Sequence, residues 1–211
     1  MSRTVCAVLV LAIVAGCTRD DADPRSDVAV DSATVPADAT AIPRADPPIL
    51  TAAPDTSLVT GPDELAALSA VLDVPVAGVE RSQLRDTFTQ ARGDRTHEAL
   101  DILAPRGTPV LSATDGRLLR MFDSRPGGLM VYATDASERF ILLYGHLDSY
   151  APGLRDGMQL VRGQVIGYVG TTGNAPPDTP HLHFGILRGD PAVSWSEGVA
   201  VNPYPLLVPG G

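Results

Sequence analysis

The chain has 211 residues, with 25 Asp and Glu against 16 basic residues and a formal net charge of −9. All the basic residues are arginines, and an acidic chain without a basic stripe argues against nucleic-acid binding. The length allows one ordinary domain and an additional segment. The two cysteines, Cys6 and Cys17, lie in the first 17 residues. We therefore expect no disulfide and no thiolate ligand in the folded part, where any metal must be held by His, Asp or Glu.

The N-terminus has the pattern of a bacterial export signal. Arg3 precedes an apolar run from Val5 to Ala15, which is shorter than the roughly 20 residues that span a bilayer. Val14-Ala15-Gly16-Cys17 resembles a lipobox, which implies a lipoprotein signal peptide over residues 1–16 and a lipidated Cys17. The alternative is an ordinary secretory signal followed by a chance cysteine. A lipobox implies export and a lipid anchor in a bacterial membrane, facing the periplasm or cell wall. The absence of Asp after Cys17 favours the outer membrane, by resemblance to enterobacterial lipoproteins.

Residues 17–57 predict a flexible tether between this anchor and the folded domain. The segment is rich in Asp, Ala, Pro, Thr and Val and has no periodic apolar face, so it cannot bury enough surface to offset its ordering entropy. We place the folded domain at residues 58–211, with its core at about 74–205. A short helix is predicted over residues 62–72, where acidic residues in the first turn precede leucines at helical spacing. Whether this segment blocks the cleft is left open.

Beyond residue 74 the sequence consists of short β-type runs separated by Gly and Pro. The predicted strands cover residues 74–79, 108–113, 116–122, 129–134, 140–146, 165–169 and 181–187. Regular short strands with turn signals between them predict an all-β fold, an antiparallel two-sheet sandwich or barrel-like domain with a short N-terminal helix. Asp135 lies in a turn context and is expected to be solvated.

The most informative run is His181-Leu182-His183-Phe184-Gly185-Ile186, which carries two histidines two positions apart. On a strand, residues i and i+2 point to one face. His181 and His183 can therefore face one cavity, with Leu182 and Phe184 packed in the core. The sequence has four histidines, all in motif-like settings, and they suggest a zinc site of two imidazoles and one carboxylate, with a fourth position open for water.

The other two histidines are ambiguous when taken singly. His97 and Asp101 are four residues apart, about 13 Å on a straight strand, so they can share an ion only if the chain bends, which we expect near Ala99. Alone, such a pair is more often a surface pair than a metal site.

His146 lies at the end of a predicted strand, directly after a glycine. It suits either a half-buried histidine bonded to backbone or a residue at a cleft. The proline-rich loop over residues 170–180 suits either a surface connection or a cleft wall.

Together these motifs resemble one protein family. The motifs are His-x-x-x-Asp at 97–101, Gly-His-Leu at 145–147, Thr-Gly-Asn at 172–174 and His-Leu-His-Phe at 181–184. In this order they resemble the lysostaphin/LytM-type zinc endopeptidases of bacterial cell walls, over about residues 74–205. The flanking turns at 104–110 and 115–116 agree. Ala99 departs from the family, which most often has Gly there, and this matters if the bend needs a positive φ.

The resemblance implies a division of roles. His97, Asp101 and His183 would be zinc ligands, and His146 and His181 would be the catalytic histidines beside the metal. Three ligands leave a position for water, and amide hydrolysis also needs a base and an oxyanion donor. We assign the base to His181, because it shares a strand face with His183. His146 would then stabilise the tetrahedral intermediate or protonate the leaving amine.

The resemblance also implies the substrate, the peptide cross-links of peptidoglycan, and cleavage at a D,D bond. Three alternatives remain: a non-catalytic wall-binding or amidase-activating module of the same fold, an exported protease of proteins, and a structural wall-binding lipoprotein. All five site positions are present, which disfavours a degenerate domain. The expected partners are peptidoglycan and, through the anchor, a membrane. No motif requires a dimer, so a monomer is expected.

Overall fold

The computed structural model describes residues 61–210. The predicted signal peptide (1–16), the lipidation site Cys17 and the predicted tether (17–57) lie outside the described residues. Within residues 61–210, no helix has both the length and the apolar character needed to cross a bilayer.

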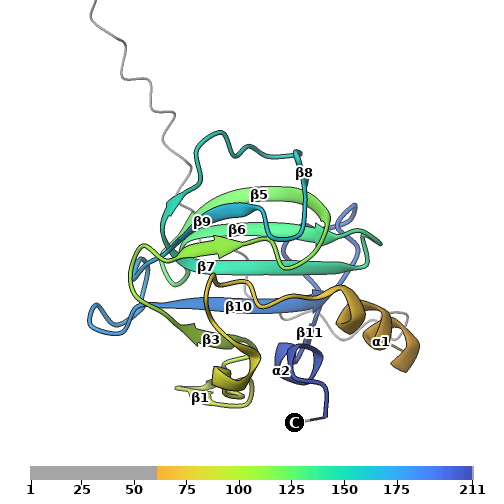
Figure 1. Cartoon of the computed structure of the whole chain (residues 1–211), viewed down its shortest axis with the longest axis horizontal. Coiled ribbons are helices and arrows are strands. Elements are labelled where there is room, and N and C mark those ends of the chain that lie inside the picture. The colour runs from red at the N-terminus through yellow and green to blue at the C-terminus, as the bar shows by residue number, and fades with distance from the viewer. Residues whose placement is uncertain (1–60, 211) are drawn as a thin grey trace, which may run out of the picture. The chain divides into compact units, whose positions relative to one another are not determined.

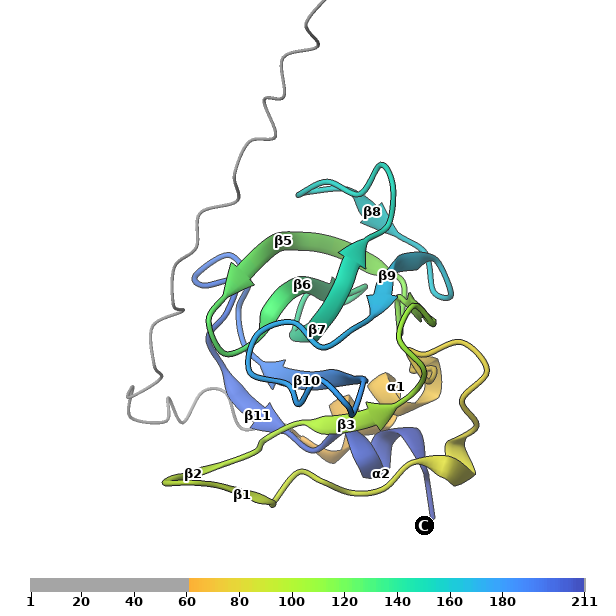
Figure 2. The same ribbon diagram turned by 90° about the vertical axis from the view of Figure 1, so that its left-hand side faces the viewer.

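Nine strands form one antiparallel sheet that curls on itself (Figures 1 and 2). Its main path runs β11-β10-β7-β6-β5-β8, while β3 pairs with β10, β9 pairs with β7, and β4 pairs with β9. The strands are β3 (Leu100–Leu103), β4 (Pro109–Leu111), β5 (Gly116–Ser124), β6 (Gly128–Asp135), β7 (Phe140–Tyr150), β8 (Gln159–Leu160), β9 (Val165–Val169), β10 (His181–Arg188) and β11 (Val199–Val201). A separate hairpin joins β1 (Ala91–Arg92) and β2 (Arg95–Thr96). The predicted all-β antiparallel class is confirmed.

The core forms where apolar residues alternate along β10. Leu182, Phe184 and Ile186 are fully buried, and the Phe184 ring lies 5.3 Å from that of Tyr144 on β7. Because side chains alternate across a strand, this packing turns His183 to the opposite face. Tyr144 also accepts a hydrogen bond from the backbone N–H of Ala113 (3.0 Å), which joins β7 to the loop after β4.

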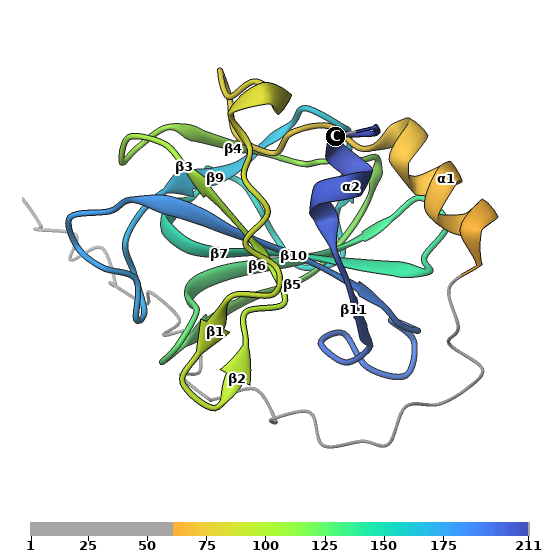
Figure 3. The same ribbon diagram turned by 90° about the horizontal axis from the view of Figure 1, so that it is seen from below.

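Two helices cover one side of the sheet. The predicted N-terminal helix is confirmed as α1 (Pro62–Val71), and a short α2 (Pro203–Leu207) lies beside it (Figure 3). Leu68 of α1 is buried in the core. Glu64 pairs with Arg139 and with Arg188 at the far end of β10, which fixes α1 to the sheet.

The structure corrects two of the expectations. Residues 74–79 do not form a strand: Pro75 has no N–H to donate, Gly78 turns the chain with φ +75°, and only Val76 makes an isolated bridge, to Val110. Asp135 is buried rather than solvated, because it accepts backbone hydrogen bonds in the turn before β7, among them one from Phe140. The other six predicted strands are present, while β1, β2, β3, β8 and β11 were not predicted.

Candidate active site

Strand pairing brings the predicted ligands together. In the register between β3 and β10, His183 lies opposite Asp101. On its other side, His183 lies opposite Gly145 of β7, so His146 follows at the same edge. The site therefore lies where three neighbouring strands present polar side chains on one face.

His97 reaches the site because the chain bends between it and β3. Glu98 adopts a positive φ of +56°, and the bend that follows at Ala99 confirms the predicted position. The positive φ falls on Glu98 and not on Ala99. Alanine in place of the family's usual glycine is therefore compatible with this backbone.

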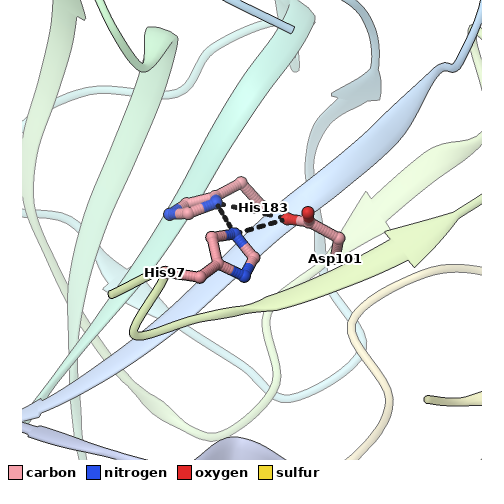
Figure 4. A group of neighbouring side chains, drawn as sticks. All are labelled: His97, Asp101 and His183. Atoms are coloured by element: carbon pink, nitrogen blue, oxygen red, sulfur yellow. Dashed lines mark hydrogen bonds and ion pairs between the residues drawn. The ribbon is translucent and has the colours of Figure 1, made fainter. Parts of the chain in front are cut away.

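Three side-chain atoms that could hold a metal ion converge at the end of this bend (Figure 4). His97 Nε2 lies 3.0 Å from Asp101 Oδ1 and 3.1 Å from His183 Nδ1, and His183 Nδ1 lies 3.3 Å from Asp101 Oδ1. Ligand atoms at 2.0–2.1 Å from a tetrahedral zinc ion are about 3.3–3.4 Å apart. The residues present therefore fit a zinc ion with one position left open.

Hydrogen bonds to backbone carbonyls orient the histidines toward the centre. His97 Nδ1 lies 3.0 Å from the carbonyl oxygen of Thr87, and a carbonyl oxygen can only accept, so Nδ1 must carry the proton. In the neutral ring this leaves the Nε2 lone pair facing Asp101 and His183. Such a bond fixes the tautomer of a metal-ligating histidine.

The two oxygens of Asp101 have different partners. Oδ1 faces the histidines, whereas Oδ2 accepts a hydrogen bond from Arg92 at 2.5 Å. Burial raises the pKa of Asp101, but the close contacts of its carboxyl group with the rings of His183 and His97 hold that pKa well below its usual range. Burial also lowers the pKa of His183. Both groups are therefore in their metal-binding protonation states at neutral pH.

His146 and His181 form a second pair beside this triad. Their Nδ1 atoms each lie 2.8 Å from a backbone carbonyl oxygen, that of Thr172 for His146 and that of Thr179 for His181. In the neutral rings, Nε2 therefore carries the lone pair. The two rings lie 5.0 Å apart, and His181 Nε2 is 3.7 Å from Asp101 Oδ1. Burial, reinforced by the nearby His183, lowers the pKa of His146 to about 4.

The loop over residues 170–180 is clamped against the sheet, as expected of a cleft wall. The hydroxyl of Thr172 donates to the Leu147 carbonyl (2.7 Å) and accepts from the Leu129 N–H (3.0 Å). Glycines allow this approach: a Cβ on Gly173 would lie 2.4 Å from the backbone nitrogen of Gly128. The loop therefore holds the carbonyl groups that orient His146 and His181. The motif at 172–174 indicated this region, but the backbone acceptors were not predicted.

A groove of about 420 Å³ contains all five predicted site residues. Its other lining residues are Arg92, Arg95, Thr96, Ser124, Pro126, Gly127, Met130, Tyr132, Leu143, Asn174, Ala175 and Pro176. Residues 61–73 contribute nothing to this lining, because α1 is fixed at the other end of β10. In the described part of the chain, the N-terminal helix therefore does not obstruct the groove. Arg92 and Arg95 were not predicted as site residues, since exposed arginines are common on any surface.

The site-bearing part of the chain matches a known family. The model described as "Peptidase family M23" matches residues 95–203, which include all five site residues. The chain is 36% identical over 131 residues to the L-Ala–D-Glu endopeptidase of Bacillus subtilis, covering 58% of this chain and 39% of that protein.

Two solved structures share the fold. A Ruminococcus gnavus structure that carries the name lytM is 30% identical with a TM-score of 0.53, covering 64% of this chain and 59% of that one. The catalytic domain of lysostaphin from Staphylococcus simulans is 26% identical with a TM-score of 0.50, covering 59% and 90%. The chain spans less than half the length of the curated relatives it matches.

Proposed function

The chain belongs to peptidase family M23, and from this premise we propose that it is a zinc-dependent endopeptidase that hydrolyses peptide cross-links of peptidoglycan. One observation carries the proposal: three candidate ligand atoms within 3.3 Å of one another lie beside two histidines whose Nδ1 atoms are held by backbone carbonyl groups. A non-catalytic module of the same fold would have no need of this complete set.

We assign zinc binding to His97 Nε2, Asp101 Oδ1 and His183 Nδ1. Zinc, when bound, lowers the pKa of a water molecule toward neutrality and polarises the scissile carbonyl. Strand pairing and the bend at Glu98 hold these three atoms together, so only a small separation of the side chains would be needed to receive the ion.

The two remaining histidines move the protons. His181 Nε2 accepts the proton of the attacking water, since its Nδ1 proton is committed to Thr179 and its ring lies beside the ligand triad. His146 enters the reaction neutral because of its lowered pKa. It can therefore protonate the leaving amine only after its Nε2 has received a proton, and the proton that His181 takes from the water balances this transfer.

The location of the substrate agrees with the predicted export signal. We propose that residues 1–16 direct export, that Cys17 carries the lipid anchor, and that residues 17–57 form the tether. An anchored hydrolase on a tether would reach the peptide stems of the cell wall. The outer membrane remains the favoured site of the anchor, and a monomer the expected state.

The test uses the purified full-length chain, its zinc content by elemental analysis, and peptidoglycan digestion followed by mass spectrometry of the released peptides. We expect about one zinc per chain and soluble fragments whose masses identify the bond cut. His183→Ala should lose both zinc and fragments, whereas Arg155→Gln, a change at an exposed site outside the groove, should lose neither. A zinc-free, inert protein that still sediments with peptidoglycan would instead support a binding module.

A further inference from the structure

The β1–β2 hairpin adds positive charge to one wall of the groove. It extends from the sheet at the start of β3, on the side away from α1 (Figures 2 and 3). Both of its arginines, Arg92 and Arg95, line the groove. The chain as a whole has a formal net charge of −9, and positive charge at the groove would favour the approach of an anionic ligand.

The two arginines are not equivalent. Arg92 donates a hydrogen bond to Asp101 Oδ2 at 2.5 Å, so the charges of Arg92 and Asp101 largely cancel. Within residues 61–210, the side chain of Arg95 has no hydrogen bond or ion pair, and it is exposed at the groove. Asp101 is the only acidic residue that lines this groove among the described residues, and both its oxygens are occupied.

Arg95 is close in the chain to the proposed zinc ligand His97, and therefore to the place where the scissile bond would lie. Arg95 precedes His97 by two residues, so their Cα atoms are within about 7 Å of each other. Asp94 at the hairpin turn and Glu98 at the bend do not line the groove, so neither competes for the Arg95 guanidinium there. A substrate anion lying one or two residues from the scissile amide would meet an arginine without a carboxylate partner.

We propose that Arg95 is a specificity-determining residue that binds a free carboxylate of the substrate peptide next to the scissile amide. This inference rests on the proposed function. A planar guanidinium binds a carboxylate through two parallel hydrogen bonds, and a γ-linked glutamyl residue keeps a free α-carboxylate. The substrate class is therefore an acidic stem peptide, and conversion of that carboxylate into a carboxamide removes the contact.

The test compares two synthetic stem peptides that differ only in that one glutamyl α-carboxyl group is free or a carboxamide. For the full-length zinc-loaded chain we measure KM and kcat for each peptide, and Kd by calorimetry. We expect the free carboxylate to be favoured about three- to tenfold in KM and Kd, as for a partly exposed charged pair. Arg95→Gln should abolish this preference by raising KM and Kd for the peptide with the free carboxylate alone, whereas Arg155→Gln should keep the preference.

Equal binding of both peptides by the wild-type chain would overturn the inference, as would an Arg95→Gln variant that keeps the preference or loses affinity for both peptides alike. Binding that prefers the carboxylate, with neither peptide cut, would refute the proposed hydrolase and leave the carboxylate site standing.

Discussion

His183 and Asp101, which are 82 positions apart in the sequence, face each other across the β3–β10 pair, and Nδ1 of the histidine lies 3.3 Å from Oδ1 of the carboxylate. The metal site is therefore a property of strand register. A slip of one residue would turn either side chain to the opposite face of the sheet. The core contacts of Phe184 and Leu182 oppose such a slip, because they would have to leave the interior.

Asp101→Asn should remove zinc binding with little change in fold. The amide keeps the size of the carboxylate and can still accept from Arg92, but it brings no negative charge to the ion. We expect zinc affinity to fall by at least about 100-fold, measured by competition with a chromogenic chelator. Asp63→Asn, at the exposed first turn of α1, should bind zinc like the wild type. Retention of tight zinc by Asp101→Asn would contradict the assigned ligand set.

The zinc-free chain should lose stability as the pH falls from about 6.5 to about 4. The pKa of folded His146 is lowered to about 4, below the roughly 6.5 of an unfolded histidine. The unfolded state therefore binds the proton first, and stability is complete above pH 6.5 and lost as the pH falls. The shift corresponds to at most roughly 3 kcal/mol, and His183 contributes in the same direction.

His146→Asn is the matching variant for this pH dependence, because Asn tolerates the positive φ of +59° at this position. Urea unfolding of both proteins in a metal chelator, at several pH values between 7 and 4, gives the comparison. The variant should show a shallower decline of the unfolding free energy. Parallel curves for the two proteins would rule out His146 as the source.

Thr172→Val should destabilise the domain and slow catalysis, while Thr172→Ser should do neither. Valine has the shape of threonine but leaves the Leu129 N–H and the Leu147 carbonyl without the hydroxyl that joins them. We expect a loss of about 1–3 kcal/mol in unfolding free energy. Because the Thr172 carbonyl orients His146, kcat should also fall, as measured on peptidoglycan fragments. A variant that lost stability but kept wild-type kcat would separate the loop from the catalytic geometry.

The sequence was sufficient to predict the features that depend on residues close to one another in the chain. The two-residue spacing of His181 and His183 placed both on one face, and the spacing of His97 and Asp101 required the bend that the structure has at Glu98 and Ala99. Contacts between segments that are far apart in the chain could not be predicted in this way. The carbonyl groups that orient the histidines belong to Thr87, Thr172 and Thr179, and a backbone acceptor carries no signature in the identity of its residue.

The same limit applies to the fold. β3 and β11 are short and pair at the side of β10, so neither has an alternating pattern long enough to predict. The apolar run near Val76 looked like a strand because burial alone produces such a composition. Pro75 and Gly78 instead make it a buried loop that contributes one bridge.

Arg92→Gln should weaken zinc binding through Asp101 without removing a ligand. Arg92 holds Oδ2 at 2.5 Å and so leaves Oδ1 to the histidine side. A partner of this kind, one step removed from the metal, typically affects metal affinity 10- to 100-fold. Since the arginine is about half exposed, we expect the lower end, about tenfold, in chelator competition. Arg92→Lys, which keeps a cation but not the planar guanidinium with its two parallel donors, should give an intermediate loss.

Arg95→Gln is the control. It removes the same charge from the same hairpin without touching Asp101, and its zinc affinity should equal that of the wild type. Equal losses in the Arg92 and Arg95 variants would mean that the charge of the hairpin, and not the hydrogen bond to Oδ2, governs the metal.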